Sequence, residues 1–307
     1  MVIGREIGRG AFGSVFKATW RNSDCVVKQL NIDNTDSQAV SDFLKEAAMV
    51  LQLRPHSNVC QIFGVCNNPE YPICIVMEYV AGGSLKDLVY EPLTIPLTFP
   101  MALGFAKDIV RGMIHIHAEN LLHCDLACRN LLAASQGENS WAIKVSDFGL
   151  ARASESGIYD AKQEAKFPIR WSAPEVLTDR KVSRASDVWS FGVVLWEVLE
   201  GRMPYYELMN NNEVIFAVCT KKEPLPPPAK RIEYPNELYD MMLQCWSYHP
   251  ADRPSFDEIY SKLVALEPNQ KVQEDYGNVV PSSGAHEYNE FMSNSEFDVV
   301  PRDSNSN

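Results

Sequence analysis

The hydrophobic pattern of the chain changes its period once, close to residue 80. Before that point the apolar residues occur in short runs, Val15–Trp20, Cys25–Leu30 and Ile73–Met77, which predict β-strands. After it, Met101–Glu119 has the spacing of an amphipathic helix. Ser186–Leu199 is a nearly all-apolar helix, of the kind that lies in the middle of a core. The sequence therefore predicts a strand-rich part followed by a larger helical part.

A helix and a glycine pair complete this outline. Apolar residues recur at helical spacing from Val40 to Leu51, which predicts one helix inside the strand-rich part. Gly82 and Gly83 then mark a turn between the two parts. Together these patterns predict two lobes with a cleft between them.

The charge balance excludes some classes of function. The 307 residues are 46% apolar and 22% charged, as in a globular protein, and the net charge is −12. Such an acidic chain is a poor candidate for sequence-independent nucleic-acid binding, because that binding depends on Lys and Arg side chains at the phosphates. No run of 18 apolar residues predicts a membrane span, and no basic-then-apolar leader follows Met1.

The eight cysteines lie in apolar segments and form no C-x-x-C pair. This pattern favours buried thiols in a reducing compartment over a zinc site or a disulfide framework. We therefore expect a cytoplasmic protein, or the cytoplasmic portion of a larger receptor.

The C-terminal segment differs in composition from the rest. From Pro268 to Asn307 it contains seven acidic side chains, six serines and two basic side chains, with no sustained periodicity. Such a segment cannot bury enough apolar surface to fold. We expect residues 267–307 to be a disordered acidic tail.

A glycine-rich motif lies near the N-terminus. Gly8–Val15 matches G-x-G-x-x-G-x-V, and glycines allow a backbone to approach a phosphate closely. An ordinary hairpin turn would explain the glycines alone. A Rossmann site would need a helix directly after them, but a strand-type segment follows, and no Walker-type G-x-x-x-x-G-K-[ST] motif occurs.

A lysine and a glutamate in the first part suggest an ion pair. Lys28 ends a strand-type run, and Glu46 lies on the polar stripe of the predicted helix. A strand lysine is ordinarily solvated, but a Lys–Glu pair would hold the ammonium where it can meet the phosphates of a nucleotide.

Two further motifs carry carboxylates. His123–Asn130 contains Asp125 and, five residues later, Asn130, while Asp147 begins Asp-Phe-Gly. Each Asp alone could cap a helix or start a turn. Together the three residues supply two oxygen ligands for a divalent cation and a carboxylate free to take a proton, as magnesium-assisted phosphoryl transfer requires.

These motifs, in this order, resemble those of the eukaryotic protein kinase family. The resemblance covers Gly4 to about Leu266, nearly nine-tenths of the chain. Further matches are Ala173–Glu175, Asp187–Gly192, Cys245–Trp246 and Arg253–Pro254.

The resemblance implies an α+β fold with two lobes. An N-lobe over residues 1–80 would contain a small antiparallel sheet with one helix, and a C-lobe over residues 81–266 would be larger and helical. A buried ion pair between Glu175 and Arg253 would support the loop on the substrate side.

The resemblance also implies how ATP would bind. Gly8, Gly10 and Gly13 would cover the phosphates, and Lys28, held by Glu46, would contact the α- and β-phosphates. The other implied nucleotide-binding positions are Ile7, Val15, the gatekeeper Met77, the hinge residues Glu78 and Val80, and Leu132.

The catalytic roles follow in the same way. Asp125 would be the base that accepts the proton of the substrate hydroxyl, and Asn130 and Asp147 would bind Mg²⁺. Arg129 belongs to the same set of catalytic residues.

Two segments favour tyrosine as the acceptor in protein substrates. Asp125–Asn130, with sequence DLACRN, is close to the DLAARN of receptor-type tyrosine kinases, and Ala127 replaces the lysine common in serine/threonine kinases. Residues 166–171, KFPIRW, resemble the tyrosine-kinase loop in which a proline forms a rigid shelf.

Two alternatives remain open. Leu53–His56 resembles the tyrosine-kinase-like group, which phosphorylates serine and threonine. A pseudokinase scaffold is the second alternative, although such proteins usually lack Lys28, Asp125 or Asp147, all of which are present here.

Two positions depart from the family pattern. Cys124 replaces an arginine that normally pairs with a phosphate on the activation loop, which puts that mode of activation in doubt. Val26 replaces an alanine above the adenine, and we expect a somewhat altered nucleotide affinity.

Three tyrosines are candidate phosphorylation sites. Tyr159 lies in the implied activation loop, where Arg152 or Arg170 could receive its phosphate. Tyr276 and Tyr288 lie among acidic residues of the tail and would, once phosphorylated, be docking sites for phosphotyrosine-binding adaptors. A tail that only keeps the domain soluble is the alternative.

Overall fold

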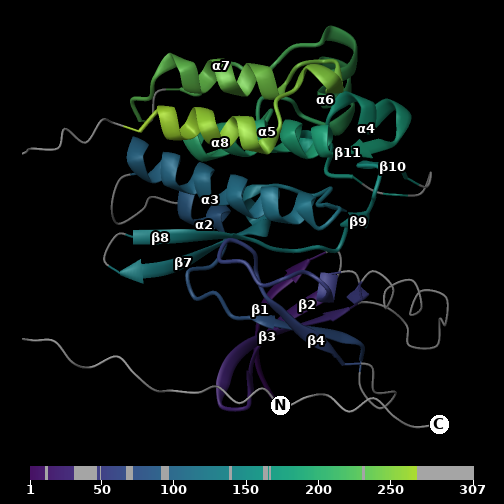
Figure 1. Cartoon of the computed structure of the whole chain (residues 1–307), viewed down its shortest axis with the longest axis vertical. Coiled ribbons are helices and arrows are strands. Elements are labelled where there is room, and N and C mark those ends of the chain that lie inside the picture. Colours follow the sequence, from purple (N-terminus) through teal and green to yellow (C-terminus); the bar gives the residue numbers. More distant parts are fainter. Residues whose placement is uncertain are drawn as a thin grey trace, which may run out of the picture. The chain divides into compact units, whose positions relative to one another are not determined.

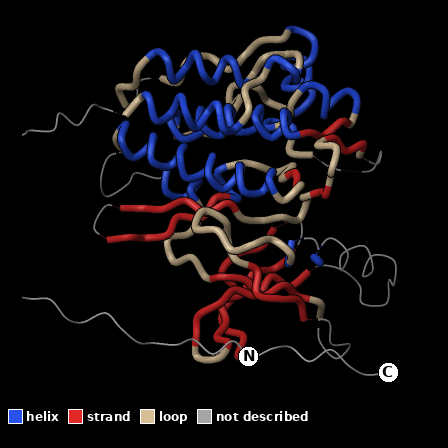
Figure 2. The backbone as a smooth tube through the Cα atoms, in the orientation of Figure 1, coloured by secondary structure: helices blue, strands red, loops and turns tan. Residues whose placement is uncertain are grey.

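The strand-rich part folds into one antiparallel sheet with the spatial order β1-β2-β3-β5-β4 (Figures 1 and 2). Its strands are β1 (Val2–Gly10), β2 (Gly13–Trp20), β3 (Ser23–Leu30), β4 (Ile62–Cys66) and β5 (Cys74–Glu78). Arg21 and Asn22, both with positive φ, form the two-residue turn between β2 and β3, a geometry that suits the twist of a hairpin. β3 occupies the centre of the sheet, between β2 and β5.

The structure is a computed structural model. It describes residues 1–10, 13–30, 47–48, 50–66, 72–90, 97–137, 140–161, 165, 167–229 and 232–267. These residues belong to one compact unit, Met1–Pro268. Most of the predicted helix from Val40 to Leu51, including Glu46, and the whole of the predicted tail beyond Glu267 lie outside the described residues.

The second part of the chain is mainly helical (Figures 1 and 2). Its helices are α2 (Leu85–Tyr90), α3 (Phe99–Ala118), α4 (Pro174–Asp179), α5 (Arg184–Glu200), α6 (Asn211–Ile215), α7 (Asn236–Cys245) and α8 (Phe256–Ala265). Its short helical turns are η1 (Cys128–Asn130), η2 (Ile169–Trp171), the π-helical η3 (Phe216–Lys221) and η4 (Pro250–Asp252). Its strands form three two-stranded ladders, β7 (Leu131–Gly137) with β8 (Ser140–Val145), β6 (Leu121–Leu122) with β9 (Arg152–Ala153), and β10 (Ile158–Asp160) with β11 (Lys181–Ser183).

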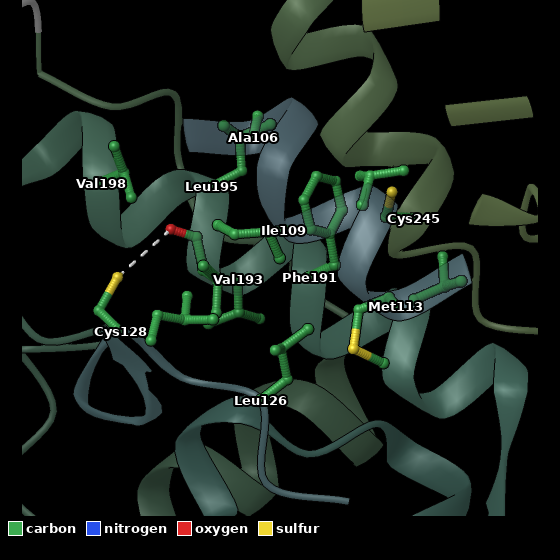
Figure 3. Packing of buried hydrophobic residues seen from close by; sticks show 14 of the residues in the cluster. Ala106, Ile109, Met113, Leu126, Cys128, Phe191, Val193, Leu195, Val198 and Cys245 are labelled. Atoms are coloured by element: carbon green, nitrogen blue, oxygen red, sulfur yellow. Dashed lines mark hydrogen bonds between the residues drawn. The ribbon is translucent and has the colours of Figure 1, made fainter. Parts of the chain in front are cut away.

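Helix α5 lies in the middle of the core, as its apolar sequence predicts. A capping box starts it, because the Ser183 hydroxyl accepts a hydrogen bond from the Ser186 amide while the Ser186 hydroxyl accepts one from the Ser183 amide. Phe191 and its neighbours on α5 pack against Ile109 and Met113 of α3 (Figure 3). A Cβ on Gly192 would lie 2.7 Å from the Trp246 ring, so only glycine allows this close contact between α5 and the end of α7.

The β7–β8 hairpin contacts both the glycine turn and the N-lobe. The amide of Ala133 on β7 donates to the carbonyl of Gly83, and a Cβ on Gly82 would lie 2.2 Å from the Ala133 oxygen. The Val145 amide on β8 donates to the carbonyl of Asn58, just before β4. Gly82, in the pair predicted as a turn, is therefore also a position where two backbones meet without space for a side chain.

The predicted fold class is confirmed: the chain has an antiparallel five-stranded N-lobe and a helical C-lobe. No helix in the described part of the chain combines the length and the apolar character that crossing a membrane requires. All eight cysteines are described, and each is a free thiol.

Candidate active site

Asp125 lies in the segment between β6 and η1 and is buried. Its carboxylate contacts the guanidinium of Arg129, one helical turn further along the chain. The Arg129 guanidinium also lies 4.5 Å above the ring of Trp171, in η2. The segment that contains Asp125 and Arg129 is thus held in place by both charge and an aromatic contact.

His123 orients the backbone of the same loop. Its Nδ1 accepts a hydrogen bond from the Asp125 amide, at 3.2 Å, and its Nε2 lies 3.0 Å from the carbonyl oxygen of Ser146. These two partners require a ring that accepts at Nδ1 and donates at Nε2. A fully buried imidazole therefore connects the loop that contains Asp125 to the segment that carries Asp147.

Asn130 is held by two hydrogen bonds. Its side-chain Nδ2 donates to the backbone carbonyl of Asp125 at 2.7 Å, and its backbone carbonyl accepts from the Ser146 amide at 2.9 Å. With the amide nitrogen donating in this way, the side-chain oxygen is the atom that remains as an electron-pair donor.

Asp147 receives the ammonium of Lys28. Its Oδ1 lies 2.5 Å from the Lys28 Nζ and 3.3 Å from the Gly149 amide. Lys28 is on the central strand β3, so this ion pair joins the N-lobe sheet to the C-lobe. Asp147 has a φ of 61°, a left-handed conformation that a residue other than glycine adopts at a cost of order 1 kcal/mol.

The two carboxylates have opposite electrostatic environments. Burial raises the pKa of Asp125 above its ordinary value, and Arg129 opposes this only in part. Burial also raises the pKa of Asp147, but the ammonium of Lys28 and the Gly149 amide outweigh it, so the net pKa of Asp147 is lowered. Two carboxyl groups whose environments separate their pKa values are suited to different roles.

The strand register places the predicted nucleotide-binding residues on one face of the sheet. Val15 is opposite Lys28 and also opposite Gly8, and Val26, two residues before Lys28, is opposite Met77. Because opposite residues and residues two apart share a face, these side chains lie on the face from which Lys28 reaches Asp147. Val26 is buried there.

The other predicted nucleotide-binding residues lie on β1 and β2, on β5 and just after it, and on β7. Ile7 is exposed on β1, Val80 is buried after β5, and Leu132 follows η1 on β7, beside the glycine turn through a bridge to Ser84. Gly10 pairs with Gly13 at the ends of β1 and β2. Glu78, at the end of β5, accepts hydrogen bonds from Lys144 and from the Gln61 amide.

The predicted pair between Lys28 and Glu46 stays a prediction, because Glu46 lies outside the described residues.

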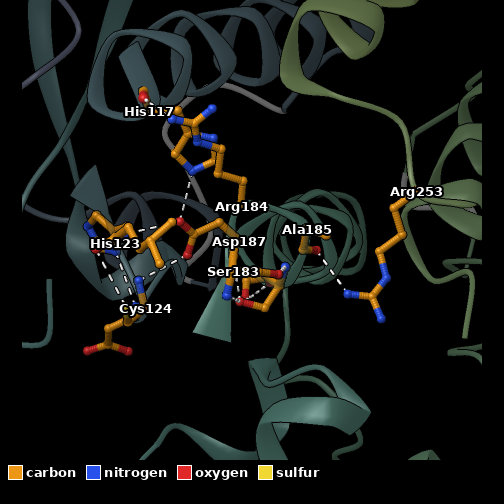
Figure 4. A network of polar contacts seen from close by, with 12 residues as sticks. His117, His123, Cys124, Ser183, Arg184, Ala185, Asp187 and Arg253 are labelled. Carbon is orange, nitrogen blue, oxygen red and sulfur yellow. Dashed lines mark hydrogen bonds and ion pairs between the residues drawn. The ribbon is translucent and has the colours of Figure 1, made fainter. Parts of the chain in front are cut away.

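Asp187, in the first turn of α5, is hydrogen-bonded to the backbone of the loop that precedes Asp125 (Figure 4). Its two carboxylate oxygens accept hydrogen bonds from the amides of His123 and Cys124, at 2.9 and 3.0 Å, and His117 Nε2 lies 2.9 Å from Oδ2. Burial raises the pKa of Asp187, but the contacts with His117 and the His123 amide outweigh it and lower the net pKa. Sequence reasoning found this residue only as part of a motif match and gave it no role.

Cys124 has a φ of 65°, and burial raises the pKa of its thiol. Its Sγ donates to the carbonyl of Leu122. A neutral thiol in this position supplies no positive charge to the loop that contains Tyr159.

Glu197 is a second residue that sequence reasoning missed. It is almost fully buried within α5, where Oε1 accepts from the Tyr90 hydroxyl at 2.7 Å. Its Oε2 accepts from the Cys128 amide at 3.1 Å and from the Trp171 ring nitrogen at 2.9 Å. The sequence signal that could have found it is a carboxylate inside the apolar run of α5. Burying such a group costs free energy unless its oxygens accept hydrogen bonds.

Glu175, in the first turn of α4, forms an ion pair with Arg253. Both terminal guanidinium nitrogens of Arg253 contact the Glu175 carboxylate, at 2.6 and 2.8 Å, and Arg253 also donates to the carbonyls of Ser247 and Ala185. The structure therefore contains the pair that the resemblance implied.

Of the two arginines considered for Tyr159, the structure places Arg152 beside it. The Arg152 guanidinium lies 5.9 Å from the Tyr159 ring centre. Arg170 instead donates to the carbonyls of Pro204, Tyr205 and Leu208. It is thus engaged with a different loop.

The residues present fit a nucleoside triphosphate and a divalent cation. Lys28 supplies a buried ammonium for phosphate oxygens, and the oxygens of Asn130 and Asp147 are ligands of the hard-cation type. Among the described residues no group of three or more His, Cys, Asp or Glu could hold a metal ion. A cation with two protein ligands would complete its coordination with phosphate oxygens and water, as such cations ordinarily do beside nucleotides.

The comparisons with known proteins agree with this geometry. The family described as "Protein tyrosine and serine/threonine kinase" matches residues 1–263. Src64B of Drosophila melanogaster, a tyrosine-protein kinase, is 40% identical over 255 residues, which are 82% of this chain and 44% of the relative. The tyrosine-protein kinase SRK2 of Spongilla lacustris is 39% identical over 261 residues, 84% of this chain and 68% of the relative.

A third relative is much longer. The tyrosine-protein kinase Abl of Drosophila melanogaster is 37% identical over 260 residues, which are 84% of this chain but 15% of the relative. The chain thus spans less than half the length of two of these curated relatives. Its family implies ATP as a substrate and the use of a divalent metal. Because the family match covers most of the chain, the protein belongs to the protein tyrosine and serine/threonine kinase family.

Proposed function

We propose that the chain is an ATP-dependent protein-tyrosine kinase that transfers the γ-phosphate to tyrosine hydroxyls of protein substrates, with residues 1–266 as its catalytic domain. The observation that carries the proposal is the pair of carboxylates in opposite environments. Asp147 is held as an anion by Lys28, while Asp125 lies apart from that pair beside Arg129. The Asp147 carboxylate is suited to binding a cation, and the Asp125 carboxylate is suited to accepting a proton.

Each residue then has one task. Asp125 accepts the proton of the tyrosine hydroxyl as its oxygen bonds to the γ-phosphorus and the bond from that phosphorus to the β–γ bridging oxygen breaks. Arg129 orients the Asp125 carboxylate. Lys28 binds the α- and β-phosphates, and the glycines of β1 and β2 cover them from above.

Asn130 and Asp147 bind Mg²⁺ in this proposal. Held by these two residues, Mg²⁺ would supply positive charge beside the phosphate oxygens. Ile7, Val15, Met77, Glu78, Val80 and Leu132 contribute to the nucleotide site around it.

The choice of tyrosine rests on the substrate-side loop and on the relatives. Pro168 directly precedes η2, and Trp171 is fixed by Glu197 and by the Arg129 guanidinium above it. This gives a rigid surface on which a phenol ring can lie. All three relatives are named tyrosine-protein kinases. Serine and threonine remain the second candidate, because the family description covers both classes.

The test is a comparison of three peptides that differ only in the acceptor, Tyr, Ser or Thr, incubated with the protein and magnesium-ATP. We expect phosphate on the tyrosine peptide alone. Transfer to serine or threonine at a similar rate would favour the tyrosine-kinase-like alternative, and no transfer to any peptide would favour the scaffold.

Tyr276 and Tyr288 are proposed as adaptor-docking sites, on the sequence alone. Mapping of phosphosites after incubation with magnesium-ATP, with Asp125→Asn as the control, should detect phosphate on one of them only in the active protein. A tail that stays unmodified while Tyr159 is labelled contradicts this proposal.

A further inference from the structure

A cavity of about 500 Å³ lies in the C-lobe, and none of the residues assigned to the active site lines it. Its walls come from four segments: the C-terminal end of α5, the loop of residues 205–208, the helical stretch α6–η3, and the proline-rich segment 223–229. Trp196, Tyr205, Tyr206 and Phe216 supply aromatic rings, and three prolines supply further apolar surface. The proposed function uses no part of it.

One wall is fixed by hydrogen bonds to the backbone of the proline-rich segment. Trp196 donates through Nε1 to the carbonyl of Pro226 at 2.7 Å, and the Tyr239 hydroxyl donates to the carbonyl of Leu225 at 2.8 Å. The Ala229 amide donates to the Glu200 carboxylate at 2.6 Å. The wall is therefore formed before any ligand arrives, which lowers the entropy cost of binding.

The facing wall is fixed by Arg170. This arginine, in η2, donates to the carbonyls of Pro204, Tyr205 and Leu208, at 2.9, 2.6 and 3.0 Å. Helix α6 also contacts η2. The cavity is thus connected by direct contacts to the loop on which a substrate would lie.

The cavity is acidic. Four glutamates line it against one lysine, Lys221, whose Nζ lies 3.7 Å from the carboxylate of Glu223. Glu213 accepts hydrogen bonds from Asn210 and from the Met209 amide. Glu207 is exposed, and the part of the chain that the structure describes gives its carboxylate no hydrogen-bond or ion-pair partner. A cation entering the cavity would therefore meet uncompensated negative charge.

The rim carries exposed aromatic rings that already attract cations. Tyr206 is 43% exposed and Phe216 is 52% exposed. The guanidinium of Arg202 lies 5.1 Å from the Tyr206 ring centre, and the Lys221 ammonium lies 5.9 Å from that of Phe216. Aromatic faces next to carboxylates favour a guanidinium or ammonium that arrives on an apolar support.

We propose that this cavity is a docking site for a protein partner that inserts an arginine or lysine side chain flanked by apolar residues. The charge of the lining selects the cation, and the aromatic rings and prolines bury the apolar residues on either side of it. Binding sites for protein anchors commonly combine a preformed apolar pocket with a few placed polar groups.

The probe is the labelled pentapeptide Ac-Leu-Phe-Arg-Phe-Leu-amide, and its control is the same peptide with citrulline, a neutral isostere, in place of arginine. Binding to the full chain is measured by fluorescence anisotropy without nucleotide. We expect saturable binding of the arginine peptide and about tenfold weaker binding of the citrulline peptide. Because no nucleotide is present, failure here leaves the proposed kinase activity untouched.

Four variants localise the binding. Glu207→Gln should weaken the arginine peptide about threefold and leave the citrulline peptide unchanged, because the carboxylate is exposed. Phe216→Ala should weaken both peptides about tenfold. Asp240→Asn and Val264→Ala change an exposed acid and an exposed apolar residue outside the cavity and should alter neither affinity. Equal melting temperatures of the variants show that all are folded.

The contrary outcomes are distinct. The proposal is overturned if the two peptides bind with equal affinity or if no saturable binding is seen. It is also overturned if neither Glu207→Gln nor Phe216→Ala changes the affinity. Arginine amide alone binding as tightly as the peptide would assign the cavity to a small cation instead. If sedimentation shows a dimer and Phe216→Ala abolishes that dimer, the cavity is instead occupied by a second copy of this chain.

Discussion

Asp125 and Asp147 both contact a basic side chain, but their pKa values are shifted in opposite directions. A lysine from the other lobe lowers the pKa of Asp147 against the effect of burial, while burial dominates at Asp125. The difference depends on Lys28, whose ammonium is the only one of its kind that the described residues bring to Asp147. At the scale of single residues, this lysine is what turns the pKa of Asp147 in the direction opposite to that of Asp125.

Lys28→Met should impair catalysis by misplacing the phosphates, and Glu46→Gln should impair the same step if Glu46 positions Lys28. The expected result is a coupling of about 1 kcal/mol or more between the two changes in a double-mutant cycle on kcat/KM. Purely additive losses would mean that the two side chains do not act together.

Asp187→Asn should destabilise the protein by about 3 kcal/mol at neutral pH, because buried donors from His123 and Cys124 lose their charged acceptor. The folded-state pKa of Asp187 is lowered, so its stabilisation is present above the unfolded value of about 3.9 and is lost as the pH falls through the folded value. Urea unfolding should therefore show that the difference in free energy of unfolding between the wild type and Asp187→Asn becomes smaller below pH 4. A difference that stays constant down to pH 3 contradicts this account.

At the scale of elements, α5 organises the site from within the core. Asp187 near its first turn holds the catalytic loop, and Glu197 near its end holds Tyr90, Cys128 and Trp171. A helix that is apolar on nearly all sides provides a rigid support for these two buried carboxylates. Asp187 and Glu197, two charged residues in this apolar helix, therefore connect the core to the candidate active site.

Glu197→Gln should lower the free energy of unfolding by about 1–3 kcal/mol, because the amide leaves at least one buried donor without an acceptor. Tyr90→Phe removes one hydrogen bond and should cost about 1 kcal/mol. Denaturant unfolding measures both, with Glu237→Gln on the exposed side of α7 as the control. A Glu197→Gln protein as stable as the control would show that its hydrogen bonds do not contribute.

Tyr159 belongs to the short β10–β11 ladder, opposite Val182. Its phosphate would have Arg152 close by, but Cys124 offers no charge. Tyr159→Phe should therefore lower activity toward a peptide only a few-fold after preincubation with magnesium-ATP. Near-complete inactivation would require another basic partner.

At the scale of the whole molecule, the sequence predicted what local periodicity and motif spacing encode. Met101–Glu119 is α3 (Phe99–Ala118) within two residues, and Ile73–Met77 overlaps β5. The family resemblance was confirmed, and the structure brings Lys28 and Asp147 together.

Other features depend on contacts between distant segments and leave no local pattern. The ladders β6–β9 and β10–β11 have only two or three residues per strand, too few for periodicity to indicate them. Glu197 acquires its role only because three segments converge on it. The cavity beside η2 likewise exists only in the folded chain, where Arg170 meets the loop after α5.

The central claim is the division of labour between the two carboxylates. The measurement that tests it most directly compares Asp125→Asn with Asp147→Asn, by single-turnover phosphate transfer to a tyrosine peptide and by the Kd for magnesium-ATP.

We expect Asp125→Asn to lower transfer by at least about 100-fold with nearly unchanged nucleotide affinity, because only the base is lost. Asp147→Asn should instead weaken magnesium-dependent nucleotide binding. An Asp125→Asn protein that keeps wild-type turnover, or an Asp147→Asn protein with unchanged affinity for magnesium-ATP, would contradict the account.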